Sequence, residues 1–225
     1  MKKALGVGFV VVCVAIGGYW GSVKYRESQL VAAMAPLVKN GSIRVNDSVL
    51  VEVDPGNITF GEAIKKLDEN TSEIDKKIIE LQSLDASIAP GKQTLAVEYL
   101  RAGQVLTRSL AGLSKKSLTV SATRQRSDEE MKAVRSASGY AVEYAVKSAL
   151  RANEAATKAA TDYLGQLPEM CESAKKFKDQ RQKLLKDGIS ESVINPDNLD
   201  KLVSKCNADK EQVKAETKPS TVMTK

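Results

Sequence analysis

The chain has 225 residues and a formal net charge of +6, because 34 lysines and arginines face 28 aspartates and glutamates. Aromatic residues make up only 4% of the sequence, which favours helices over β-rich folds that use aromatic and β-branched side chains. A mild positive charge with few stacking aromatics argues against nucleic-acid binding. The sequence has no histidine, which excludes most familiar hydrolase sites and removes the commonest zinc ligand.

The N-terminal segment, residues 1–23, has the pattern of a membrane anchor. Lys2 and Lys3 precede 20 uncharged residues, from Ala4 to Val23. A helix of that length measures about 30 Å, which matches the hydrocarbon core of a bilayer. Tyr19 and Trp20 stand near its far end, where interfacial aromatics are common. The segment is therefore predicted to be a signal anchor in a bacterial inner membrane, with the remaining chain in the periplasm.

A cleaved signal peptide is the alternative for the same segment. Ala15 and Gly17 are small residues at the spacing expected for cleavage after Gly17. The protein would then be periplasmic or secreted. Both alternatives export the rest of the chain.

Residues 24–58 are predicted to form a juxtamembrane helix followed by a short β-hairpin. Pro36 and the pair Asn40-Gly41 are expected to stop the helix. Apolar residues then alternate with polar ones, which is typical of a half-buried strand, until Asp54-Pro55-Gly56. The alternating residues are Ile43, Val45, Val49, Val51 and Val53.

Residues 59–208 are predicted to form a helical bundle. Thr59 and Glu62 match a capping box, which marks a helix start. A coiled-coil-like stripe follows, and Pro90-Gly91 is expected to end it. The stripe consists of Phe60, Ile64, Leu67, Thr71, Ile74, Ile78 and Leu81.

Later helix boundaries are predicted from further punctuation in the sequence. A second helix is expected to reach about Arg126, and a second capping box at Ser127 and Glu130 then starts a third. Small residues line one stripe of the third helix, and Pro168 is expected to begin a fourth. Asn195 is predicted to cap a last helix, before a disordered tail at residues 209–225. The predicted fold is an all-α, elongated antiparallel helical bundle. The small-residue stripe consists of Ser138, Val142, Ala145, Ala149, Ala152, Ala156, Ala159 and Tyr163.

Two cysteines are placed to form a disulfide. Cys171 lies 17 residues before Gly188 and Cys206 lies 18 residues after it, so a hairpin turning at that glycine brings both to the same height. Oxidation fits an exported protein. The alternatives are two buried thiols, or a redox or metal site, which the absence of any C-x-x-C pair disfavours.

Two groups of side chains are candidates for a ligand or partner surface. Tyr140 and Tyr144 lie one helical turn apart, either in a pocket between helices or at a bundle edge with their hydroxyls in water. Lys175, Lys176 and Arg181 belong to a basic helix that faces either anionic lipid and acidic wall polymers or only solvent.

Patterns with catalytic or metal-binding potential are weak. Ser173 and Lys176 match the S-x-x-K motif of serine acyltransferases, but the companion motifs are absent. Asp128, Glu129 and Glu130 are better explained as acidic residues at a helix start than as metal ligands. We predict no catalytic, cofactor or metal site.

The predicted function is therefore that of a non-enzymatic envelope protein. Its exported bundle would act as a scaffold or bind another envelope protein. The alternative is a sensor-like bundle in the periplasm that binds a small ligand between its helices.

Overall fold

A computed structural model describes residues 2–54, 56–194 and 198–206, with side chains described from residue 22 onward. The described residues form long helices joined by short loops and contain no strand, which confirms the all-α bundle. The elements are α1 (Lys2–Val53), α2 (Phe60–Ser83), α3 (Pro90–Ser136), α4 (Ala141–Lys186), the 3-10 turn η1 (Glu191–Val193) and a helix at residues 198–206.

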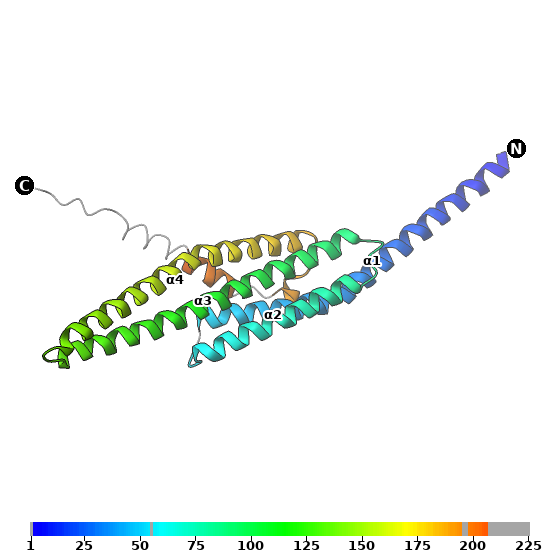
Figure 1. Ribbon diagram of the computed structural model, residues 1–225. Coiled ribbons are helices and arrows are strands. Elements are labelled where there is room, and N and C mark those ends of the chain that lie inside the picture. The colour runs from blue at the N-terminus through cyan, green and yellow to red at the C-terminus, as the bar shows by residue number, and fades with distance from the viewer. Residues whose placement is uncertain (1, 55, 195–197, 207–225) are drawn as a thin grey trace, which may run out of the picture.

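The helices run antiparallel and form an elongated molecule with two projecting ends (Figure 1). At one end α1 extends alone beyond the other helices. At the other end the hairpin of α3 and α4 extends beyond α1 and α2. We call residues 117–164 of this hairpin the arm, and the packed helices between the two projecting ends the body.

The predicted membrane segment, Ala4 to Val23, belongs to the helical backbone of α1. Its side chains up to residue 21 lie outside the described ones. Among the described residues, no helix is both long and apolar enough to cross a membrane. The predicted cap Asn195 and the tail at residues 209–225 also lie outside the described residues.

The predicted β-hairpin is wrong, because residues 43–53 continue α1. Val45 and Val49 are buried and lie one helical turn apart, on the face that also buries Val38. This spacing suits a helix packed on α2 and α3 as well as a strand. The predicted stop at Pro36 and Asn40-Gly41 is also wrong, because α1 runs through these residues. Gly41 instead allows close packing: a Cβ there would lie 2.6 Å from Leu100 Cδ2. Tertiary packing therefore overrides the turn-forming preference of the glycine and the strand preference of the valines.

The capping box at the start of α2 is confirmed. The backbone N–H of Thr59 donates to Glu62 Oε2 at 2.8 Å, and the N–H of Glu62 donates to Thr59 Oγ1 at 3.3 Å. The Thr59 hydroxyl also donates to Glu62 Oε2, at 2.9 Å. The hydrogen bonds that the Thr59 backbone N–H and hydroxyl donate to the Glu62 carboxylate, the backbone one first, lower its pKa. The predicted stripe of α2 is confirmed in part. Leu67, Ile74 and Leu81 are fully buried, whereas Phe60 at its start is 43% exposed.

Two further predicted helix boundaries are absent from the structure. Ser127 and Glu130 lie inside α3, and Pro168 lies inside α4. Ser127 is buried. Its small side chain lets α3 and α4 pack closely at this level. Pro168 has no backbone N–H, so one hydrogen bond inside α4 is missing. Pro168 itself is exposed, and buried residues before and after it keep α4 packed, so the helix continues. The closest buried residues are Ala159 before the proline and Met170 after it.

A buried tyrosine joins three helices in the body. The ring of Tyr99 in α3 stacks on Phe177 of α4 with centroids 4.8 Å apart. Its hydroxyl lies 2.8 Å from Ser42 Oγ of α1, at hydrogen-bond distance. Tyr99 is 0% exposed, and this burial raises the pKa of its hydroxyl to about 12.

This tyrosine is expected to make the fold sensitive to alkali. The unfolded chain releases the Tyr99 proton near the ordinary pKa of 10.0, whereas the folded protein keeps it up to about 12. The stabilisation is therefore complete below about pH 10 and is lost as the pH rises towards about 12. We expect the free energy of unfolding, measured with urea, to fall less steeply over this range in Tyr99→Phe than in the wild type. Equal slopes would contradict the prediction, since both chains share their lysines and other tyrosines.

Candidate partner-binding arm

The arm is held together by a seam of alanines. Ala145, Ala149, Ala152, Ala156 and Ala159 of α4 are all buried. They step by four and three residues, as in a coiled coil, and their small side chains let α3 approach closely. These five residues confirm the central part of the predicted stripe. Val142 at its outer end is 38% exposed.

A second row of residues runs along α4 beside this seam. Each member follows one residue of the predicted small-residue stripe by one position, so the row is rotated from the seam by about 100° around the helix. Its large members are exposed, with Val146 at 40%, Leu150 at 59% and Leu164 at 53%. We call this set the arm row. It consists of Val146, Leu150, Asn153, Thr157, Ala160 and Leu164.

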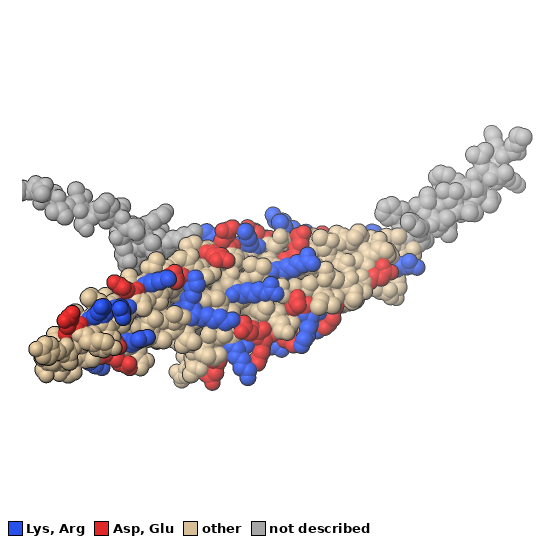
Figure 2. All heavy atoms as spheres, viewed as in Figure 1, with Lys and Arg blue, Asp and Glu red and all other residues tan. Residues whose placement is uncertain are grey.

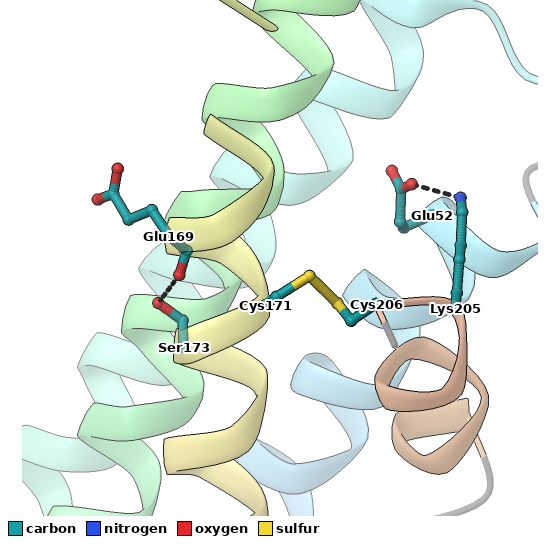
Figure 3. The surroundings of a disulfide bond; sticks show 6 residues. All are labelled: Glu52, Glu169, Cys171, Ser173, Lys205 and Cys206. Carbon is teal, nitrogen blue, oxygen red and sulfur yellow. Dashed lines mark hydrogen bonds and ion pairs between the residues drawn. A yellow bond between two sulfur atoms is a disulfide. The ribbon is translucent and has the colours of Figure 1, made fainter. Parts of the chain in front are cut away.

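In the body, the same face of α4 is covered by the helix of residues 198–206. The predicted disulfide is confirmed: it joins Cys171 of α4 to Cys206 across a Cα–Cα distance of 5.7 Å (Figure 3). Lys178 Nζ donates to Asp200 Oδ1 at 2.8 Å, further along the same pair of helices. Cys171 and Cys206 are 3% and 1% exposed, so this disulfide is structural. The face is therefore covered in the body and open along the arm.

The two predicted tyrosines lie at the free end of the arm. Tyr140 is fully exposed, at 103%, and Tyr144 is 79% exposed. Both rings therefore stand in solvent and do not lie between helices. Figure 2 shows an uncharged surface at this end and a mixture of acidic and basic side chains over the rest of the drawn face.

Opposite charges follow one another along α3 in the arm. Arg124 and Arg126 precede Asp128, Glu129 and Glu130, with Ser127 between the two signs. The acidic residues lie inside α3, so the prediction that they mark a helix start is wrong. Within the described part of the chain, neither these two arginines nor Asp128 and Glu130 form an ion pair. The described residues hold no acidic, cysteine or histidine cluster that suits a metal ion.

The three predicted basic residues of α4 do not form one surface. Lys175 is exposed. The ammonium group of Lys176 lies 2.8 Å from the Glu172 carboxylate. Arg181 is 8% exposed, and its guanidinium lies 3.6 Å from Glu191 Oε1. Only the two lysines face solvent.

The S-x-x-K pair is not brought together either. The Ser173 hydroxyl is buried, donates to the backbone carbonyl of Glu169 at 3.0 Å (Figure 3), and lies 3.3 Å from Ser109 Oγ of α3. Lys176, one turn further along, points to Glu172. Ser173 therefore serves the contact between α3 and α4.

A groove of about 530 Å³ opens where the body meets the arm. Its walls come from the end of α1, the loop before α2 with the first turn of α2, and the facing sides of α3 and α4, and they are mainly apolar. The groove has no signal in the sequence, because only the packing of distant segments creates it. The side chains that give it its apolar character are Val51, Ile58, Phe60, Ala63, Leu113 and Tyr163.

Comparison of the chain with protein-family models, with curated proteins and with solved structures found no match. Function must therefore be argued from the arm and the body themselves.

Proposed function

We propose that this protein is a non-enzymatic scaffold of the bacterial envelope and that its arm binds a protein partner. The observation that carries the proposal is the arm row, a line of exposed apolar side chains on one face of α4. Single exposed apolar residues are common on soluble proteins, whereas aligned ones mark interaction sites. Val146, Leu150 and Leu164 are aligned in this way.

The body indicates what kind of element the row accepts. The same face of α4 carries a helix at residues 198–206, whose Leu199 and Leu202 are buried. A partner that presents an amphipathic helix would cover the open half of the face by burying apolar side chains in the same way. Small-molecule binding draws less support, since Tyr140 and Tyr144 stand in solvent.

The position of α1 and the arm at opposite ends of the molecule supports a scaffold role. α1 has 52 residues and leaves the body on the side opposite the arm (Figure 1). If Ala4 to Val23 forms the proposed anchor, the arm is held away from the membrane, where another envelope protein can reach it. The disulfide between Cys171 and Cys206 fits an oxidising compartment such as the periplasm.

The proposal predicts position-specific crosslinking in intact cells. A photoreactive phenylalanine analogue at Leu150 should give a protein adduct, because this side chain lies in the arm row. The matched control is Ile79, which is equally exposed at 60% but lies on α2. Adducts are separated by size and identified by mass spectrometry. The same adducts from both positions, or none from Leu150, would rule out the arm as the binding element.

A further inference from the structure

We propose that the partner of the arm row is a second copy of this chain, packed antiparallel so that the two arms form a four-helix bundle. This inference rests on the proposed function in taking the arm as the binding element, and it names the partner. Three features of the arm point to it: the direction of the neighbouring helix, the order of residues in the arm row, and the order of charges in α3.

The helix of residues 198–206 sets the direction. Asp200 contacts Lys178 and Cys206 contacts Cys171, so this helix runs antiparallel to α4. Cys206, its last described residue, lies level with Cys171, and the exposed row begins at Leu164, two turns further towards the tip. An incoming helix that is also antiparallel to α4 therefore lies in line with residues 198–206 and continues the same interface. The α4 helix of a second copy meets this requirement.

In that direction the arm row meets apolar residues of the other copy. When Asn153 of one copy lies opposite Asn153 of the other, Val146 lies opposite Ala160 and Leu150 lies opposite Ala156 of the seam. Leu164 lies opposite Val142, the exposed outer end of the predicted stripe, so apolar side chains meet across the two-fold axis. The two central asparagines can donate and accept hydrogen bonds to each other, and such a pair fixes the register of packed helices.

The charges of α3 are complementary in the same register. Two contacts set the level of α3 beside α4, one from Lys116 Nζ to the carbonyl of Asp162 and one between Ser109 and Ser173. They place Ser127 level with Asn153, and both residues line one shallow depression between the helices. The two-fold axis then passes near Ser127. The basic pair of each copy, Arg124 and Arg126, then lies level with the acidic triplet of the other copy, Asp128 to Glu130.

Four of these charged side chains have no ion-pair partner among the residues that the structure describes. Arg124, Arg126, Asp128 and Glu130 form no ion pair among the described residues. Apposed opposite charges favour the antiparallel register over others. On the outer edge of α4, Lys147 lies opposite Ala159 of the other copy, one position from Lys158. Both lysines are exposed and can turn towards water, so this repulsion is small.

This arrangement places the two bodies at opposite ends of the dimer. The two α1 helices then leave in opposite directions. A dimer of anchored chains would therefore join two facing membranes, whereas chains cut after Gly17 would form a diffusible dimer.

The test is disulfide trapping of the full chain in its native membranes. With Cys13→Ala as background, Asn153→Cys places one new thiol on the predicted two-fold axis. Ala155→Cys is the matched control, because residue 155 is exposed on the opposite side of α4. Mild oxidation should give a product of twice the chain mass from Asn153→Cys and not from Ala155→Cys. Adding Leu150→Lys should reduce that product by about tenfold, since each dimer contains the change twice.

Charge reversal supplies a second measurement. Arg124→Glu with Arg126→Glu should weaken trapping by about tenfold. Adding Asp128→Lys and Glu130→Lys to the same chain should restore it, because opposite signs again face each other. No product of twice the chain mass, or equal products from positions 153 and 155, would overturn the second copy as the partner.

Three other results would overturn this inference, and they differ in what they mean for the proposed function. If the dimer formed only after residues 207–225 were removed, that segment would be the occupant of the row and the inference would fail. If Leu150 crosslinked a different protein while Asn153→Cys gave no dimer, the proposed function would stand and this inference would fall. If Leu150 gave no adduct at all, both would fall.

Discussion

Replacing both Cys171 and Cys206 with alanine is expected to lower the free energy of unfolding by about 3–4 kcal/mol. The disulfide closes a loop with a sequence separation of 35 residues, and a loop of that size carries this penalty in the chain-entropy account of crosslinks. Both sulfur atoms are buried, so alanine also removes some packing. Urea denaturation of the oxidised wild type and of the double variant measures the difference.

The loss should be local as well as global. Without the disulfide, the helix of residues 198–206 is held by buried Leu199 and Leu202 and by two ion pairs at its ends. One ion pair joins Lys178 to Asp200. The other joins Lys205 to Glu52, as Figure 3 shows. We expect amide hydrogen exchange in this helix to accelerate before exchange in α2 or α3. Cys13→Ala is the control and should leave both measurements unchanged. A loss of stability below about 1 kcal/mol would show that native packing alone holds the helix in place.

The features that could be predicted from the sequence are those set by local patterns. The Thr59–Glu62 capping box is a four-residue unit, and its hydrogen bonds depend only on residues within it. The α2 stripe needs only one apolar face. The disulfide was predicted from a single hairpin at Gly188, whose positive φ of 90° confirms the turn.

The errors arose where a single residue suggested a break that long-range packing removed. Gly41 and Ser127 were interpreted as a stop and a cap, yet in the structure they are small contact residues between neighbouring helices. Pro168 was interpreted as a helix start, yet α4 is packed on both sides of it. Local preferences of this kind amount to about 1 kcal/mol for a glycine and about 3 kcal/mol for a proline. Burial along α1, α3 and α4, which have 52, 47 and 46 residues, outweighs them.

The arm row could not be predicted for a different reason. Its apolar members are interrupted by Asn153 and Thr157, so the sequence alone shows a weak stripe beside a strong one. The row becomes a candidate site only when the structure shows that residues 198–206 cover its continuation and leave the arm open. The same holds for the groove at the end of the body, since four separate segments line it.

Gly103→Ala is expected to destabilise the fold by about 1–3 kcal/mol, the usual cost of overpacking a core. A Cβ at Gly103 would lie 2.5 Å from Val45 Cγ2 and 3.0 Å from Phe177 Cε2. Val45 is fully buried with a stiff β-branched side chain, and Phe177 is stacked on Tyr99. Neither can move without disturbing the junction of α1, α3 and α4. The gain in helix propensity, up to about 1 kcal/mol, is too small to offset this.

Gly165→Ala is the matched control, because it lies in α4 with nothing within 4 Å of the added Cβ. The same substitution there should stabilise the protein by about 0.5–1 kcal/mol. The two glycines should therefore respond with opposite signs in thermal and urea unfolding. Combining Gly103→Ala with Val45→Ala should recover part of the loss, since the second change removes the methyl group that the first one strikes. Stabilisation by both single substitutions would mean that α1 and α3 are spaced more widely than the structure shows, and the roles assigned to Gly41 and Ser42 at the same interface would fail with it.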